Sequence, residues 1–178
     1  MDVTKQTASL NIDAMYETGI KQLTTKLYEP YQPQGCKWML KRETENLHIF
    51  GDDMPKGGIL ADEVGLGKTI TTLSVILCNP LPKTLIILPK SLVSQWESQI
   101  KRFCRNSIGL HIVHKNLDIG NKTGIFIMSQ SLLNCRGSIV GKSCIHNVHW
   151  DRVIIDEAHS LRNNKSKYYK KLLEELET

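Results

Sequence analysis

The sequence predicts an α/β domain with a mostly parallel sheet that is covered by helices on both faces. Short apolar runs rich in isoleucine and valine alternate with segments of helical period, which is the pattern of parallel strands joined by helices. A chain of 178 residues is long enough for one domain with a real core and too short for two nucleotide-binding lobes of ordinary size. The sequence therefore predicts one lobe.

The expected elements follow from hydrophobic period and from turn residues. Four buried strands are predicted at Gly58–Ala61, Thr84–Leu88, Gly124–Met128 and Val153–Ile155. Helices are predicted at Trp38–Arg42, Thr69–Cys78 and Ser91–Phe103, and a surface loop at Asn46–Gly58. Residues 1–22 are polar and weakly patterned, so we expect a mobile leader there and an ordered domain over residues 23–178.

Composition restricts the class of protein only broadly. The net charge of +5 is compatible with an acidic partner, but a surplus of this size is also common in proteins that never bind nucleic acid. The five cysteines are scattered and form no Cys-x-x-Cys pair, so a reducing compartment is expected and a disulfide framework is not. The N-terminal region has no apolar run typical of a signal peptide or membrane span, which predicts a soluble intracellular protein.

The strongest chemical signal is a glycine-rich loop that follows one predicted strand and opens a predicted helix. Its residues are Asp62, Glu63, Val64, Gly65, Leu66, Gly67, Lys68 and Thr69. Backbone N–H groups in such a loop can cradle phosphate oxygens, and the start of the helix adds positive potential. Lys68 is then expected to reach the β and γ phosphates of ATP, and the Thr69 hydroxyl to bind Mg²⁺. The generic pattern has glycine where this sequence has Asp62.

A second signal is a pair of carboxylates directly after the strand Val153–Ile155. Asp156 is expected to hold Mg²⁺, mostly through water, and Glu157 to orient or deprotonate the attacking water. Ligands bind at the carboxyl ends of parallel strands, and both signals are placed there. An Asp-Glu pair alone is usually a solvated strand end, so this interpretation depends on the glycine-rich loop.

The stretches Gly57–Thr69 and Asp156–Asn163 resemble motifs I and II of the Swi/Snf-type branch of superfamily-two helicases, the second beginning with a DEAH box. Asp62 is the residue that this family carries at that place, whereas the RNA-unwinding DEAD-box branch carries a small residue. The resemblance covers roughly residues 27 to 165 and implies a RecA-like P-loop lobe. By the family pattern, His159 couples the nucleotide site to other motifs.

Other family landmarks occur in the expected order. The segment Pro30–Gly35 resembles the glutamine motif, in which Gln32 would bind the adenine edge. Lys90 and Ser91 stand in a segment similar to motif Ia, and Ser129, Gln130 and Ser131 stand where motif Ib falls. These two segments are expected to contact the backbone of double-stranded DNA without reading bases. The alternative for both is an ordinary polar loop, and Trp96 is expected in the core.

Within the family, the approach to the Asp-Glu pair is most similar to members linked to DNA repair, transcription termination and viral transactivation. The resemblance thus implies a DNA-dependent, ATP-hydrolysing motor that acts in the nucleus or at another site of DNA transactions. Two alternatives stay open: a non-catalytic nucleotide or DNA binder, and an RNA helicase lobe.

Nothing in the sequence resembles motif III or the second motor lobe of this family. The arginines of that lobe complete the ATP site, and an arginine finger is worth about a thousandfold or more in rate. The chain alone is therefore expected to hydrolyse ATP poorly, with the second lobe required for turnover. A gap in the centre of the sheet is also expected, since the motif III strand lies between the strands of motifs I and II in such folds.

One cluster invites a zinc interpretation, namely Cys135, Cys144, His146 and His149. Its spacing fits no common zinc finger, and loop residues before the motif II strand are the favoured interpretation.

Overall fold

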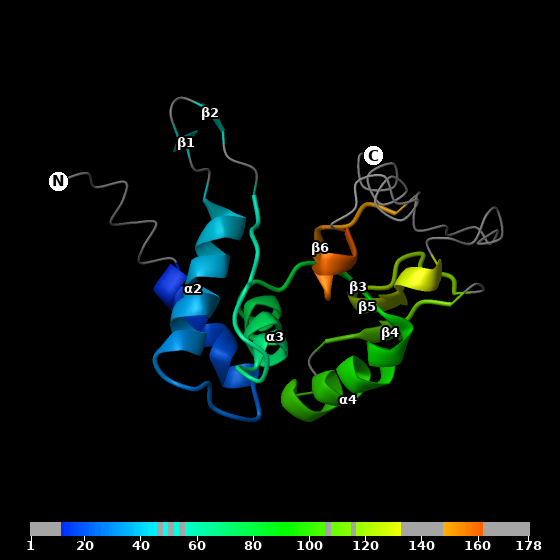
Figure 1. The fold of residues 1–178 in the computed structure, drawn as a ribbon, viewed down its shortest axis with the longest axis horizontal. Coiled ribbons are helices and arrows are strands. Elements are labelled where there is room, and N and C mark those ends of the chain that lie inside the picture. The colour runs from blue at the N-terminus through cyan, green and yellow to red at the C-terminus, as the bar shows by residue number, and fades with distance from the viewer. Residues whose placement is uncertain are drawn as a thin grey trace. The chain divides into compact units, whose positions relative to one another are not determined.

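The computed structural model describes residues 12–45, 48–49, 52–53, 56–105, 108–114, 117–132 and 148–161. The chain divides into two compact units. Figure 1 draws the fold with colour running from the N-terminus to the C-terminus. The first unit comprises Met1–Pro80 and Gln99–Ser107, and the second comprises Leu81–Ser98 and Ile108–Thr178. Within the described residues, no helix is both long enough and apolar enough to span a membrane.

The first unit is mainly helical. Residues 12–19 form a helix that continues into η1 (Ile20–Gln22), and α2 (Tyr31–Thr44) and α3 (Lys68–Cys78) follow. The helices α2 and α3 pack against each other around fully buried leucines, among them Leu40 and Leu73. The helix α2 is much longer than the predicted Trp38–Arg42, because Pro33 lies in its first turn, where a missing N–H breaks no helical hydrogen bond.

Residues 12–22 are helical, so the prediction of a mobile leader over residues 1–22 is wrong for this part of it. Ile12 and Tyr16 are buried at 7% and 8% exposure, and burial raises the pKa of Tyr16 to about 12. These two residues are four apart, which places them on one face of the helix and gives that helix an apolar stripe. Because the residues between and around them are mostly polar, the sequence pattern does not predict this helix.

The second unit contains a four-stranded parallel sheet with the order β4-β5-β3-β6. Its strands are β3 (Lys83–Leu88), β4 (Leu110–Ile112), β5 (Gly124–Ser129) and β6 (Arg152–Ile155). The central strand β3 pairs with β5 and with β6, and Leu88 is in register with Ser129. Between β3 and β4 lie the short η2 (Lys90–Leu92) and the helix α4 (Val93–Phe103), whose last residues belong to the first unit. Three of the four predicted strands are confirmed.

The fourth predicted strand, Gly58–Ala61, is wrong. These residues have no regular secondary structure and belong to no sheet, and Ile59 is 82% exposed. A strand needs a neighbour with free backbone N–H and C=O groups, and none of the described strands pairs with this segment. The described residues also contain a short antiparallel pair, β1 (His48–Ile49) with β2 (Asp52–Asp53), inside the stretch predicted as a loop.

The core of the second unit explains why its sheet is well predicted. Residues 84–88 of β3 are all buried, as a strand covered on both faces requires. Phe126 and Met128 of β5 pack with Leu85 and Ile87 of β3 in one cluster. The Trp150 ring meets Phe126 edge-on at 5.2 Å between centroids, a favoured aromatic geometry.

The three cysteines among the described residues are free and buried. A hydrogen bond between the Cys36 and Cys78 thiols raises the pKa of Cys36 and lowers that of Cys78, with burial raising both. Burial alone raises the pKa of Cys104 to about 11. Cys135, Cys144 and His146 lie outside the described residues, so the zinc hypothesis is untested, and the exposed His149 lies 3.9 Å from Asp151.

The contact between α2 and α3 leads to a stability prediction at Gly35, in the interior of α2. A Cβ built there lies 3.6 Å from the Thr71 methyl group, an ordinary contact distance. Since alanine favours a helix interior over glycine, Gly35→Ala should raise the free energy of unfolding by about 0.5–1 kcal/mol. Urea denaturation measures this change. Gly67→Ala is the opposite control, because its Cβ would lie 2.5 Å from Gln32 Nε2 at a φ of +76°; a loss of stability by Gly35→Ala would contradict the packing described.

Candidate functional site

The glycine-rich loop of the first unit has the backbone that a phosphate-binding loop needs. Gly65 and Gly67 adopt φ values of 91° and 76°, in the left-handed region, and α3 begins directly at Lys68. Residues other than glycine are strained at such angles. The loop is open to solvent, as the 97% exposure of Val64 shows. The Leu66 N–H donates within the loop, to the Glu63 carbonyl at 3.4 Å. The N–H groups of the first turn of α3 have no partner within the helix and can therefore face an anion.

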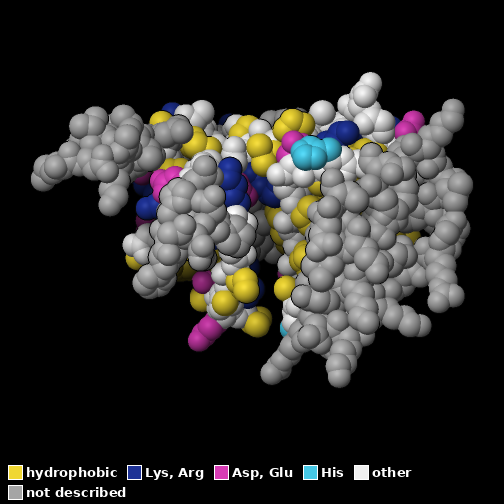
Figure 2. Space-filling model, turned by 90° about the horizontal axis from the view of Figure 1, so that it is seen from above, with side chains coloured by type: hydrophobic (Ala, Val, Ile, Leu, Met, Phe, Trp, Pro, Cys, Tyr) yellow, Lys and Arg dark blue, Asp and Glu magenta, His cyan; other side chains and the backbone are white. Residues whose placement is uncertain are grey.

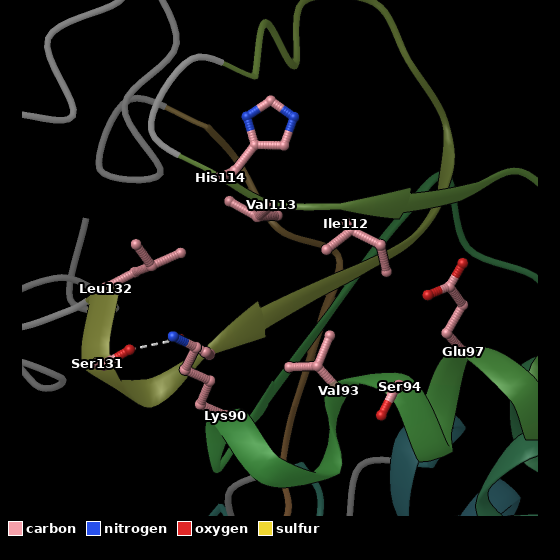
Figure 3. Close-up of a pocket in the computed structure, with 10 residues that line it drawn as sticks. Lys90, Val93, Ser94, Glu97, Ile112, Val113, His114, Ser131 and Leu132 are labelled. Atoms are coloured by element: carbon pink, nitrogen blue, oxygen red, sulfur yellow. Dashed lines mark hydrogen bonds between the residues drawn. The ribbon is translucent and has the colours of Figure 1, made fainter.

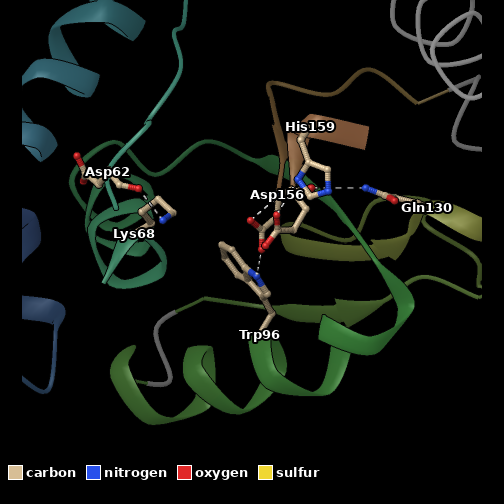
Figure 4. Close-up of polar contacts among 7 residues, drawn as sticks. Asp62, Lys68, Trp96, Gln130, Asp156 and His159 are labelled. Carbon is tan, nitrogen blue, oxygen red and sulfur yellow. Dashed lines mark hydrogen bonds and ion pairs between the residues drawn. The ribbon is translucent and has the colours of Figure 1, made fainter. Parts of the chain in front are cut away.

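Lys68 folds back over the loop that precedes it. Its Nζ donates hydrogen bonds to the Asp62 carbonyl oxygen at 2.8 Å and to the Glu63 carbonyl oxygen at 3.1 Å, the first of which is drawn in Figure 4. An ammonium group at this point can exchange carbonyl oxygens for phosphate oxygens with a small movement of a flexible side chain. Asp62 thus contributes to the loop through its backbone carbonyl.

Gln32 lies against the same loop and not at the surface. It is 3% exposed; its Oε1 accepts from the Tyr28 N–H at 2.8 Å, and its Nε2 donates to the Leu66 carbonyl at 2.9 Å. Both ends of the amide thus bind the chain's own backbone and tie the start of α2 to the phosphate loop. Its predicted contact with adenine stays a prediction, which must use the remaining donor and acceptor of the amide.

Asp156 follows the last residue of β6, and hydrogen bonds hold both its backbone and its carboxylate. Its N–H donates to the Ile87 carbonyl of β3 at 2.9 Å. Its Oδ1 accepts from the Glu157 N–H at 2.9 Å, and its Oδ2 accepts from the indole N–H of Trp96 at 2.7 Å (Figure 4). The Gln130 amide also reaches the Asp156 carbonyl, at 3.5 Å. A carboxylate oriented in this way keeps lone pairs free for water-mediated binding of a cation.

Glu157 has a left-handed backbone, with a φ of 53°. For a residue with a side chain this conformation costs about 1–2 kcal/mol. Such strain is concentrated at functional sites, where it fixes the direction of a side chain. Its carboxylate is half exposed and pairs with the exposed imidazole of His159 in η5 (Ala158–Leu161), with 3.0 Å between Oε2 and Nδ1.

The residues predicted to bind nucleic acid lie at one edge of the sheet. Lys90 and Ser91 follow β3, Gln130 and Ser131 follow β5, and Leu88 and Ser129 are paired at the strand ends. These segments therefore leave the sheet at one edge, and Asp156 leaves it at the same edge, after β6. The Ser129 and Ser131 hydroxyls lie 2.6 Å apart.

A groove of about 460 Å³ opens beside these segments (Figure 3). It is lined by Lys90, Val93, Ser94, Glu97, Ile112, Val113, His114, Ser129, Ser131 and Leu132. It offers an ammonium group, three hydroxyls, the Glu97 carboxylate and the His114 imidazole beside apolar side chains. Of these residues, the sequence analysis predicts only Lys90, Ser129 and Ser131 as functional. The three-residue strand β4 brings Ile112 to the groove, and its short mixed sequence gives no periodic signal.

The position of Trp96 is also only partly predictable. The apolar stripe of α4 predicts its burial, and it is 4% exposed. Its hydrogen bond to Asp156 was missed, although one signal exists: a buried indole N–H usually requires an acceptor.

A glycine-rich loop that opens a helix, with an Asp-Glu pair at the carboxyl end of a parallel strand, defines the class of P-loop nucleotide-binding α/β proteins. Residues 31–178 match the SNF2-related domain, and the chain belongs to this family. It resembles the structure described as the Sulfolobus solfataricus SWI2/SNF2 ATPase core in complex with dsDNA, with a TM-score of 0.69 and 26% identity over 86% of this chain and 30% of that chain. The RecA-like lobe expected from the sequence is thereby confirmed.

Two curated relatives show the range of the family. The DNA repair protein rad8 of Schizosaccharomyces pombe is 33% identical over 158 residues, covering 69% of this chain and 14% of that protein. The probable global transactivator of Orgyia pseudotsugata multicapsid polyhedrosis virus is 29% identical over 144 residues, covering 76% of this chain and 27% of that protein. The chain thus spans well under half the length of either relative.

Proposed function

We propose that this chain is the ATP-binding part of a DNA-dependent, DNA-translocating motor. One observation carries the proposal: the segments predicted to contact nucleic acid and the Asp-Glu pair leave one edge of one parallel sheet and are joined by the contact from Gln130 to Asp156. Membership of a family of ATPases supports the use of ATP. A phosphate-handling group and a nucleic-acid edge linked in this way are what a nucleic-acid-stimulated ATPase needs.

In this proposal the glycine-rich loop binds the triphosphate. The N–H groups of Gly65, Gly67 and the first turn of α3 donate to phosphate oxygens, and the Lys68 ammonium binds the β and γ phosphates. The remaining loop residues, from Asp62 to Thr69, supply its shape. Gln32 ties the loop to α2 and would bind the adenine edge through the remaining donor and acceptor of its amide.

The residues present also fit Mg²⁺, which neutralises phosphate charge when it is bound. Thr69 would supply a hydroxyl and Asp156 a carboxylate, both hard oxygen donors. Glu157 would accept a proton from the attacking water, and His159 would hold the Glu157 carboxylate in place through its 3.0 Å contact.

Double-stranded DNA is the proposed nucleic acid. The Sulfolobus solfataricus ATPase core named above was solved with dsDNA, and the groove beside Lys90 offers the cation and hydroxyls that phosphates bind. Figure 2 shows Lys and Arg side chains among hydrophobic and other side chains of the described residues. The support is therefore local geometry and not overall charge. A second motor lobe is required for turnover in this proposal, and the protein acts in the nucleus.

The DNA contact is tested by removing its cation. Lys90→Ala should weaken binding to all duplex sequences alike and lower the slope of log affinity against log salt by about 0.9, the value for one phosphate contact. Fluorescence anisotropy with labelled duplexes over a range of salt concentrations measures both quantities. Lys122→Ala is the matched control, since Lys122 precedes β5 at the opposite edge of the sheet and its Nζ donates to the Asp118 backbone carbonyl.

Three outcomes would contradict this assignment. The slope could stay unchanged in Lys90→Ala, one DNA sequence could bind far more tightly than the others, or duplex RNA of the same sequence could bind more tightly than DNA. The last result would favour an RNA helicase lobe.

A further inference from the structure

In the second unit, the buried side chain of Trp96 donates a hydrogen bond to Asp156, the residue proposed to bind Mg²⁺. Trp96 lies outside motif II. Trp96, on the inward stripe of α4, is 4% exposed and points its indole N–H at Asp156 Oδ2, 2.7 Å away. The two residues are 60 positions apart in the chain. This distance is at the short end of the range for an N–H···O hydrogen bond.

The two oxygens of this carboxylate are held by donors of different kinds. The Oδ1 atom is held by the neighbouring Glu157 N–H, which belongs to the same turn. The Oδ2 atom is held by the indole, which belongs to another element. With both atoms fixed, rotation of the carboxylate about its last side-chain bond is blocked, and its free lone pairs keep one direction.

We propose that Trp96 is a positioning residue for Asp156, holding its carboxylate in the orientation that binds Mg²⁺ with ATP. This inference rests on the proposed function of Asp156. Groups that hold metal-binding carboxylates typically affect metal affinity about tenfold to a hundredfold. Trp96 is also six residues after Lys90 (96 minus 90), on the helix that follows the proposed DNA contact through η2. The side chain that holds Asp156 therefore lies on the helix that directly follows the proposed DNA contact.

The test compares nucleotide binding with and without Mg²⁺. Trp96→Phe keeps an aromatic ring in the core but removes the N–H donor. In the full chain, we expect this variant to bind Mg²⁺ with a non-hydrolysable ATP analogue about tenfold to a hundredfold more weakly than the parent does. Binding of the same analogue in EDTA should be unchanged, because Lys68 and the glycine-rich loop are intact. A merely structural defect would weaken both.

Trp150→Phe is the matched control, since it removes an indole from the same unit where Trp150 packs on Phe126. It should leave the Mg²⁺ dependence as in the parent. A second measurement needs no core substitution: the chain has three tryptophans, so the indole N–H signal of Trp96 can be followed in ¹H–¹⁵N spectra. This signal should shift when Mg²⁺ is added with the analogue, and Asp156→Asn should shift it in the absence of ligand.

The results separate this inference from the proposed function. If the parent chain binds the analogue with a clear Mg²⁺ dependence and Trp96→Phe shows the same dependence, the inference is overturned while the proposed function stands. An indole signal that ignores both Mg²⁺ with the analogue and Asp156→Asn also overturns it. If the parent chain does not bind the analogue at all, the proposed function itself is refuted.

Discussion

Lys68→Ala should abolish ATP binding, with an affinity loss of at least about a hundredfold, or about 2.7 kcal/mol. The lysine is the cation that the glycine-rich loop holds in place, through bonds to the carbonyls of Asp62 and Glu63. Its removal leaves the phosphate charge opposed only by backbone dipoles, and it leaves two carbonyl oxygens pointing at the same space. Equilibrium binding of a fluorescent ATP analogue to the purified chain measures the effect.

A suitable control is Lys37→Ala, which removes one lysine from the same unit. Lys37 is partly exposed and its Nζ lies 2.7 Å from Asp13 Oδ1, and this ion pair raises the pKa of Lys37. A pair that is open to solvent in this way contributes little to stability, so the control variant should fold and bind ATP as the parent does. Equal binding by Lys68→Ala and Lys37→Ala would remove the assignment of the phosphate loop.

The parts of the fold that the sequence predicts well are those where burial alone determines the structure. The strands β3 and β5 are continuous apolar runs because they are covered on both faces, and such runs are recognisable without knowledge of their neighbours. Gly58–Ala61 has the same apolar character but has no regular secondary structure and is largely exposed. Its structure depends on a pairing partner, which is a property of the whole sheet and not of four residues.

The candidate site divides in a similar way. Lys68 and the glycines are predictable because loop and helix are consecutive in the chain, so the geometry is local. The buried Gln32 bonds to the Leu66 carbonyl, 34 positions away, and Trp96 bonds to the Asp156 carboxylate, 60 positions away. Sequence patterns indicate that a buried amide or indole needs a partner, but they do not identify it.

Glu157→Gln should leave nucleotide binding intact and slow hydrolysis by about 10²- to 10⁴-fold, the usual contribution of a general base. Glutamine has the same shape and can occupy the same left-handed backbone, but it cannot accept a proton from water. Since the chain alone is expected to turn over slowly, hydrolysis is measured under single-turnover conditions, with the chain in excess over radiolabelled ATP and with duplex DNA present.

Glu157→Gly separates the chemical role of this residue from its structural role. Glycine adopts a φ of 53° without a side-chain clash, so this variant should be about 1 kcal/mol more stable to urea than Glu157→Ala, and as inactive as Glu157→Gln. A residue that is strained in the native state and improves stability when replaced is retained for its side chain. If Glu157→Gln converted ATP at the parent's rate, the carboxylate would not be the base. If Glu157→Gly were less stable than Glu157→Ala, the backbone strain on which this interpretation rests would not exist.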